Sequence, residues 1–459
     1  MRANIPEGGE NDMTHHLKRL TTALFRILPL SMQDSARVSG VFRNSAWLVA
    51  DKIYQAVAGV GVTIMLARYL GPEDFGNLAF VIAFVAIFQV IANLGMDNLI
   101  LRDIGDDSQS DGTILGTVCA MRLVTGVTCW LIGYLAHGII YGFDAMLTVL
   151  VALALASLLF QPAEVIDIWF RSQGKSRHIV LNRVVVYTLS NAVKLLLVLS
   201  GASLAAFVSM LVVEFIMYAL AFVLAYRTLQ TQSRWQFDLG LGMAFLKEST
   251  PYILSGLSVM IYMRFDQILL KQYLGSAQLG IYAAVIPLAT IWYIIPTSLT
   301  SSIMPYVAEV RRDSEAAYMQ LLGKLMRLYA LFGWFVFLAT LIIAPLLVPW
   351  LYGPAYAESV MALIVFSLTN LLVGLGMARS LWVVNERKPS VSLYSTLVGA
   401  AVCLAGNIVL IPWMGILGCA IVAVLTQFTS SIGTSFLLAR PVFIIQVRSI
   451  VMPFRTVGD

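Results

Sequence analysis

Twelve apolar stretches alternate with short polar segments along the chain, and each is long enough to cross a bilayer as a helix. A hydrocarbon core about 30 Å thick needs about 20 helical residues. The pattern therefore predicts an all-α integral membrane protein with both chain ends on one face. We expect the spans, with boundaries uncertain by a few residues, near 46–66, 77–101, 113–136, 145–168, 179–200, 203–226, 251–271, 280–304, 325–350, 359–383, 391–412 and 415–438.

The basic residues indicate which face is cytoplasmic. If both termini lie there, the inner segments hold 22 of the 30 Lys and Arg residues, whereas the outer connections hold only Arg68 and Lys271. Basic residues concentrate in cytoplasmic loops of membrane proteins. The sequence thus predicts a multi-pass protein with both termini in the cytoplasm.

The composition excludes several other classes of protein. With 59% hydrophobic and 12% charged residues, and a mean hydropathy of +0.83, the chain has too little polar surface for a soluble globule. The net charge of +5 is therefore a topology signal and does not indicate nucleic-acid binding. All four cysteines lie in apolar runs without zinc-site or disulfide spacing, so no metal site and no cofactor is expected.

The chain also shows an internal duplication. YLGPEDFGNLAFVI, from Tyr69 to Ile82, aligns with YLGSAQLGIYAAVI, from Tyr273 to Ile286, and each copy joins the first two spans of its half. Its local chemistry is typical of a turn, with Gly71 ending one helix and Pro72 beginning the next. Two halves of like topology are how many transporters enclose a central site. The predicted parts are an N-terminal tail at 1–43, a first lobe at 44–226, a linker at 227–250, a second lobe at 251–438 and a C-terminal tail at 439–459.

The N-terminal tail leaves alternatives open. LKRLTTALFRILPL, at 17–30, places leucines at helical spacing among basic residues, which is typical of a helix lying on an anionic leaflet. The alternatives are a disordered tail and a true start at Met32.

Four stretches resemble the Wzx-type polysaccharide biosynthesis proteins, flippases of the multidrug, oligosaccharidyl-lipid and polysaccharide (MOP) exporter superfamily. The resemblance covers roughly 43–440, and the order and spacing of the motifs carry it. The stretches are RNSAWLVADKIYQ (43–55), ARYLGPEDFG (67–76), FLKESTPYILSGLS (245–258) and LYGPAYAESVMAL (351–363).

The resemblance implies a fold and a function. It implies two six-helix lobes around a V-shaped cavity, in a bacterial inner-membrane protein that moves undecaprenyl-pyrophosphate-linked sugar units to the periplasmic leaflet. Ion coupling would drive transport, and a polysaccharide polymerase and a chain-length regulator are the implied partners. No enzymatic activity is expected, and the sequence contains no GxxxxGK[ST] phosphate loop.

Charged residues within the predicted spans are the candidate site. An acid or base facing lipid at a helix centre costs about 2.5–3.5 kcal/mol, so such groups turn toward partners or water. Asp51 and Lys52 are neighbours and cannot pair on a helix, so their partners lie elsewhere. Asp97 has a depth similar to that of Lys52, which predicts a bridge between them. Four groups near the inner face are expected to reach the interface by snorkelling: Glu164, Asp167, Arg183 and Arg379.

The residue types suggest different tasks. Guanidinium groups bind phosphate oxygens bidentately and stay charged, so Arg264 and then Arg122 are the first candidates for contact with a pyrophosphate. The further candidate cavity cations are Lys194, Lys52 and Arg379. A carboxylate in a partly desolvated cavity can take up and release a proton, so the ion-coupling candidates are Asp266, Glu214, Asp51 and Asp97. The alternative for each is a buried structural ion pair.

Two rival functions remain at this stage. A drug exporter of the same superfamily would favour an acid-lined cavity, whereas this chain has a surplus of deep cations. A membrane glycosyltransferase or sugar polymerase would usually carry its reacting groups in a sizeable outer loop, and every outer connection here is short. The sequence identifies neither the sugar, nor the coupling ion, nor the oligomeric state.

Overall fold

The computed structural model describes residues 36–104, 108–228 and 234–451, and these residues are helical with short connections and no strand. The segment at 17–30 lies outside the described residues. Nine helical stretches in this part of the chain are long and apolar enough to cross a membrane. Three of them divide at Gly71, Gly275 or Gly415, where the backbone is not helical and the chain turns back. Because each of these three stretches contains two crossings, the nine stretches make the twelve crossings that the sequence predicts.

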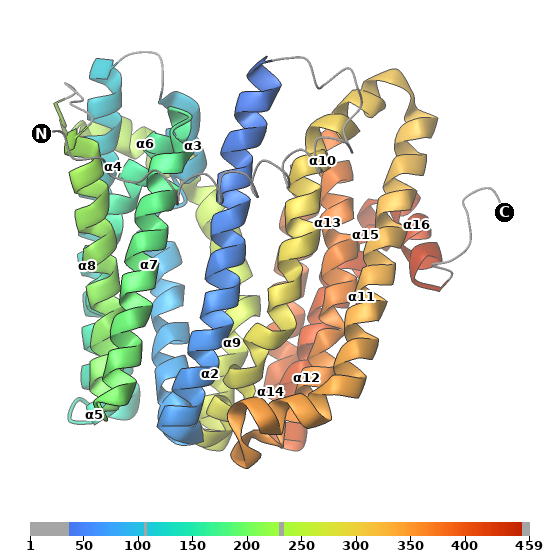
Figure 1. The fold of residues 1–459 in the computed structure, drawn as a ribbon. Coiled ribbons are helices and arrows are strands. Elements are labelled where there is room, and N and C mark those ends of the chain that lie inside the picture. The colour runs from blue at the N-terminus through green and yellow to red at the C-terminus, as the bar shows by residue number, and fades with distance from the viewer. Residues whose placement is uncertain (1–35, 105–107, 229–233, 452–459) are drawn as a thin grey trace, which may run out of the picture.

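The first six crossings form one group of helices. α4, α5, α7 and α8 stand together on one side of Figure 1, with α2 at their edge. The crossing that contains α5 and α6 is broken by two 3-10 turns around Pro162. The elements are α2 (Ala36–Ala92), α3 (Asp97–Asp103), α4 (Ser108–Tyr141), α5 (Met146–Leu155), η2 (Ala156–Leu159), η3 (Gln161–Ala163), α6 (Glu164–Ser172), α7 (Ser176–Leu199) and α8 (Leu204–Thr228).

The second group repeats this arrangement on the other side of Figure 1, with α9 between the two groups. Its fourth crossing is also interrupted, between α12 and α13. The elements are α9 (Leu239–Thr290), η4 (Ile291–Tyr293), α10 (Ile294–Asp313), α11 (Glu315–Tyr352), η5 (Pro354–Tyr356), α12 (Ser359–Ser367), α13 (Thr369–Asn385), α14 (Pro389–Phe428), the π-helical turn η6 (Thr429–Gly433), α15 (Thr434–Leu438) and α16 (Arg440–Val451).

Several helices extend beyond the apolar windows. α2 begins at Ala36, within the predicted tail, and α16 occupies part of the predicted C-terminal tail. α9 begins at Leu239, within the predicted linker, because the Asp238 carboxylate accepts a hydrogen bond from the Leu241 backbone N–H at 3.1 Å and caps the helix. Hydropathy detects the segment that lies in hydrocarbon, and polar helical turns outside that layer leave no such signal.

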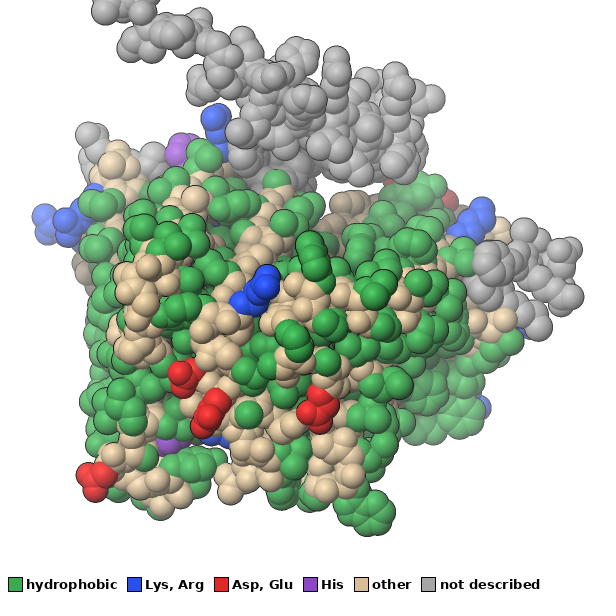
Figure 2. All heavy atoms as spheres, turned by 60° about the horizontal axis from the view of Figure 1, so that its bottom comes forward, with side chains coloured by type: hydrophobic (Ala, Val, Ile, Leu, Met, Phe, Trp, Pro, Cys, Tyr) green, Lys and Arg blue, Asp and Glu red, His purple; other side chains and the backbone are tan. Residues whose placement is uncertain are grey.

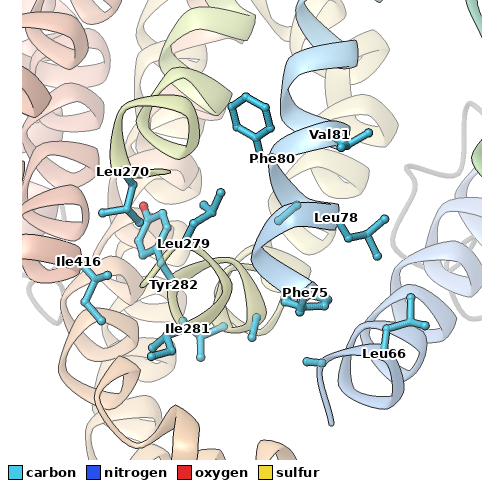
Figure 3. Close-up of a cluster of buried hydrophobic side chains, with 14 of the residues drawn as sticks. Leu66, Phe75, Leu78, Phe80, Val81, Leu270, Leu279, Ile281, Tyr282 and Ile416 are labelled. Carbon is cyan, nitrogen blue, oxygen red and sulfur yellow. The ribbon is translucent and has the colours of Figure 1, made fainter. Parts of the chain in front are cut away.

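The buried cores show where the two groups join. At the lower end of Figure 1, one cluster combines Phe75 and Leu78 of α2 with Leu279 and Ile281 of α9 (Figure 3). Toward the upper end the cores are separate: one is built from α3, α4, α6, α7 and α8 with Phe245 of α9, and the other from α10, α11, α13 and α16. The lobes therefore share a core at the lower end, whereas toward the upper end each has its own core and the start of α9 packs against the first lobe.

The two copies of the duplicated motif meet at the lower end. A methyl group on Gly76 would lie 1.8 Å from the Ser276 carbonyl oxygen, and one on Gly280 would lie 1.8 Å from the Pro72 oxygen. Only glycine permits this approach of the two backbones, and small residues at such crossings allow close van der Waals contact within a membrane. Gly76 and Gly280 occupy the same position of the repeat, so the repeat packs against itself. We call this crossing the outer contact.

Polar contacts surround the outer contact. Lys271 donates to the Asn77 side-chain oxygen at 3.0 Å, and the Ser276 hydroxyl donates to the same oxygen at 2.7 Å. The Lys271 ammonium also lies 4.1 Å from the centroid of the Phe80 ring. Lys271, expected only as an outer-loop base, therefore helps to join the lobes.

Candidate functional site

The first lobe contains a chain of ion pairs between helices. Asp51 of α2 is buried, accepts from the Gln55 amide at 2.9 Å and lies 3.8 Å from a guanidinium nitrogen of Arg183 on α7. Arg183 also donates to Asp167 at 2.6 Å, and Asp167 pairs with Arg171 one turn along α6. The expectation that the partner of Asp51 lies on another helix is confirmed. Interfacial snorkelling is wrong for Asp167, which is buried, because the two guanidinium groups hold its charge inside the lobe.

The predicted bridge between Asp97 and Lys52 is wrong. Asp97 instead lies 2.5 Å from a guanidinium nitrogen of Arg122, whose side chain is only 1% exposed. Lys52 is exposed and has no ion-pair partner among the described residues. Equal depth in the membrane does not determine which face of a helix a side chain occupies, and here Asp97 faces α4.

Lys194 and Glu214 form the third pair of the first lobe. The Lys194 ammonium lies 2.7 Å from the Glu214 carboxylate, which also accepts from the Ser190 hydroxyl at 2.7 Å. Both charged side chains are largely buried where α7 packs against α8. This geometry favours the structural interpretation of the pair.

Breaking the Lys194–Glu214 pair is expected to destabilise the first lobe. Lys194→Gln or Glu214→Gln alone leaves one charge without its counterion, and we expect each to lower the free energy of unfolding by about 1–3 kcal/mol. The double variant removes both charges and should lose less than the sum of the two, which thermal unfolding in detergent measures. Strictly additive losses would show that the two groups do not interact.

Arg264 differs from the other deep cations. No described residue forms a hydrogen bond or ion pair with it, and its side chain is only partly buried. Asp266, two residues along α9, is buried and accepts from the Tyr282 hydroxyl at 2.9 Å and from the Gln267 backbone N–H at 2.8 Å. Tyr282, which the sequence analysis did not single out, therefore orients this carboxylate.

The position of Arg264 is set by the path of α9. Early in the helix, Glu248 pairs with Arg102 of the first lobe at 2.5 Å. Later, the carbonyl oxygen of Tyr262 lies 3.7 Å from the Cys403 sulfur of the second lobe. Arg264 lies two residues beyond Tyr262 and before Lys271, where α9 contacts the first lobe again at the outer contact.

Arg379 and Glu164 complete the predicted set. Arg379 is 8% exposed and donates to the Thr434 hydroxyl at 2.9 Å and to the Ser435 hydroxyl at 3.3 Å, so it is held within the second lobe and does not snorkel. Glu164 is partly buried at the start of α6. The structure thus places most of the predicted cations in ion pairs or hydrogen bonds, and leaves Arg264 and Lys52 without partners among the described residues.

Comparison with known proteins adds a family and a fold. A family model described as "polysaccharide biosynthesis protein" matches residues 65–361. Comparison with curated protein sequences gave no match.

Solved transporters share the fold of the chain. An inward-facing multidrug resistance MATE family transporter of the MOP superfamily is 16% identical with a TM-score of 0.71, covering 86% of this chain and 96% of its own. The lipid II flippase MurJ, in an inward closed conformation, is 12% identical with a TM-score of 0.66, covering 89% and 91%. A Vibrio cholerae MATE transporter is 14% identical with a TM-score of 0.61, covering 91% and 100%.

These matches confirm the resemblance seen in the sequence. The family model spans well over half of the chain, and the solved structures share the all-α architecture of two lobes. The chain therefore belongs to the polysaccharide biosynthesis protein family.

Proposed function

We propose that this protein is a flippase for undecaprenyl-pyrophosphate-linked oligosaccharide units in the bacterial inner membrane. It would supply units for a surface polysaccharide such as O-antigen, capsule or exopolysaccharide. The observation that carries the proposal is Arg264, a guanidinium group without a protein partner among the described residues, on α9, the helix that contacts both lobes. A pyrophosphate crossing a region of low dielectric requires such a cation, because a bidentate guanidinium replaces part of its hydration.

Alternating access fits the packing of the two lobes. The two lobes share a core and the outer contact at the lower end, whereas each lobe has a core of its own toward the upper end. Rocking about this arrangement would expose a central site first to one face and then to the other. The headgroup would enter from the upper, cytoplasmic end, and the lower end would open to the periplasm. The lower end carries only scattered charged side chains (Figure 2), which supports this orientation.

Asp266 is the best candidate for ion coupling. Asp51, Asp97 and Glu214 are each engaged by a base, whereas the carboxylate of Asp266 accepts only from Tyr282 and a backbone N–H. A buried carboxylate without a bonded cation can bind a proton or metal ion when the transporter faces one side and release it on the other.

Asp266→Asn is expected to uncouple transport from the ion gradient. The amide keeps the size of the side chain and can still accept from Tyr282, but it cannot change charge. In proteoliposomes, we expect flipping of the lipid-linked substrate to lose its dependence on an imposed proton or sodium gradient. Glu309→Gln is the control, since this carboxylate has no ion-pair partner among the described residues. A gradient dependence in Asp266→Asn equal to that of the wild type would remove Asp266 from the coupling step.

Deletion of the gene tests the proposed function directly. We expect loss of surface polysaccharide together with accumulation of its lipid-linked unit in the cytoplasmic leaflet. A deletion that left surface glycans intact and instead raised sensitivity to cationic drugs would favour the MATE-like exporter. A deletion in which the oligosaccharide itself was shortened would favour the glycosyltransferase or polymerase.

A further inference from the structure

The turn between α6 and α7 has a specific pattern of backbone hydrogen bonds at the end of α6. The Lys175 N–H donates to the Phe170 oxygen at 3.0 Å, and the Gly174 N–H donates to the Arg171 oxygen at 3.1 Å. This pair of bonds is the Schellman motif, which requires a left-handed residue at its centre. Gly174 supplies it with φ of 65°. The Lys175 ammonium then lies 5.6 Å from the centroid of the Trp169 ring.

The turn between α13 and α14 repeats this motif in the second lobe. The Lys388 N–H donates to the Val383 oxygen at 3.0 Å, and the Arg387 N–H donates to the Val384 oxygen at 3.1 Å. The Lys388 ammonium lies 4.8 Å from the centroid of the Trp382 ring. The stretches WFRSQGKS, from 169, and WVVNERKP, from 382, are thus a second duplication that relates the two lobes.

The two turns differ at the left-handed residue. Where the first lobe has Gly174, the second has Arg387 with φ of 52°. A side chain at this backbone conformation is disfavoured, and such strain is concentrated at functional sites. A glycine at this position is sufficient for the turn, because the first lobe forms the same turn with Gly174. The turn therefore does not explain why an arginine occupies position 387.

A pocket beside the turn explains the arginine at this position. Arg387 and Arg379 line a cavity of about 330 Å³ that is otherwise formed mainly by Val383, Val384 and Pro389. This volume is at the lower end of the range of small-ligand sites. The site thus combines two arginine residues, of which Arg387 is exposed, with mainly apolar walls.

The positive charge in this pocket has no acidic partner among the described residues. Arg379 contacts only hydroxyl groups of Thr434 and Ser435, and its buried Nε atom has no hydrogen-bond partner. Glu386, the acid in the turn, instead pairs with Arg311 at 2.9 Å. A buried cation without a counterion is costly, and an anionic ligand would offset that cost.

We propose that this pocket binds the phosphate group of an amphiphilic lipid. The two arginines would bind the phosphate oxygens, and the two valines and the proline would contact the adjoining glycerol or alkyl carbons. Basic pockets between transmembrane helices bind lipid headgroups in this way. The phosphate has two possible sources, an anionic phospholipid of the bilayer or the diphosphate of a polyprenyl carrier. The site is separate from Arg264, so it does not depend on the proposed function.

Native mass spectrometry of the purified full-length protein in a neutral detergent tests the site. The probes are dioctanoyl phosphatidylglycerol for the phospholipid, farnesyl diphosphate for the polyprenyl carrier, and dioctanoyl phosphatidylcholine and inorganic phosphate as comparisons. We expect the wild type to retain one or both of the first two. Loss of a charge-assisted contact in Arg387→Gly or Arg379→Gln should weaken that binding about tenfold or more.

Arg387→Gly separates binding from folding. The glycine relieves the left-handed strain, so the variant should unfold at the same temperature as the wild type or higher while losing the lipid. Arg312→Gln is the matched control, since Arg312 is exposed at the end of α10 and has no ion-pair partner among the described residues, and it should bind both probes normally.

Each outcome is decisive. Weaker binding of phosphatidylglycerol alone in Arg387→Gly and Arg379→Gln assigns a bilayer phospholipid, weaker binding of farnesyl diphosphate alone assigns the carrier, and weaker binding of both assigns lipid phosphates in general. The proposal is overturned if Arg387→Gly and Arg379→Gln bind as the wild type does, if phosphatidylcholine binds as well as phosphatidylglycerol, or if inorganic phosphate alone is retained.

Discussion

Replacement of Arg264 by alanine is expected to abolish restoration of surface polysaccharide in a deletion strain at normal expression. The reason is electrostatic, because Arg264 has no protein partner among the described residues and its charge is available to a ligand. Removing it takes away a bidentate phosphate contact and breaks no hydrogen bond or ion pair with the described residues. The folded protein should therefore reach the membrane in normal amounts.

Arg264→Lys should retain part of the activity. The ammonium keeps the charge but not the planar pair of donors, so it acts on the pyrophosphate as a point charge. Arg312→Ala is the matched control, since Arg312 is exposed at the end of α10 and has no ion-pair partner among the described residues. Surface polysaccharide is measured by gel analysis of cell extracts. Full activity in Arg264→Ala would remove this residue from the site.

The second large effect is expected at the outer contact. Gly76→Ala places a methyl group 1.8 Å from the Ser276 carbonyl oxygen, which cannot move without shifting its helix. The lobes should then be unable to close at the lower end, so the protein would leave the state seen here and transport would fail. Gly280→Ala should behave in the same way, because the contact is reciprocal.

Thiol accessibility distinguishes an opened lobe interface from simple unfolding. In a background in which the native cysteines are replaced, a cysteine at Asn77 should react with a membrane-impermeant maleimide faster in Gly76→Ala than in the parent. Gly61→Ala is the control, because an added methyl group there meets nothing within 4 Å. Wild-type transport in Gly76→Ala would show that the close approach of the two glycines is not needed.

Much of the fold could be predicted because a bilayer imposes strict rules. Every backbone polar group in hydrocarbon must be satisfied within its own helix, so long apolar windows identify the crossings. The duplicated motif likewise predicted two lobes. The sequence analysis assigned turn chemistry to Gly71 and Pro72 and gave Gly76 and Gly280 no role, although their matching positions in the repeat were a signal that the two copies could meet.

The ion pairs could not be predicted in the same way. Asp97 and Lys52 have similar depths, yet Asp97 pairs with Arg122 on α4. Depth follows from position in the sequence, whereas the face of a helix depends on how neighbouring helices rotate and pack. The role of Arg387 could not be predicted either, because its left-handed backbone and the pocket that it shares with Arg379 depend on the tertiary structure.

The sequence by itself determined the membrane class, the approximate crossings, the duplication and the family, since these depend on the local cost of placing each residue in hydrocarbon or water. The tertiary structure decided which charges neutralise one another and which remain available, because ion pairing depends on distances of a few ångströms between helices far apart in the chain. It thereby separated Arg264 from the paired cations around it.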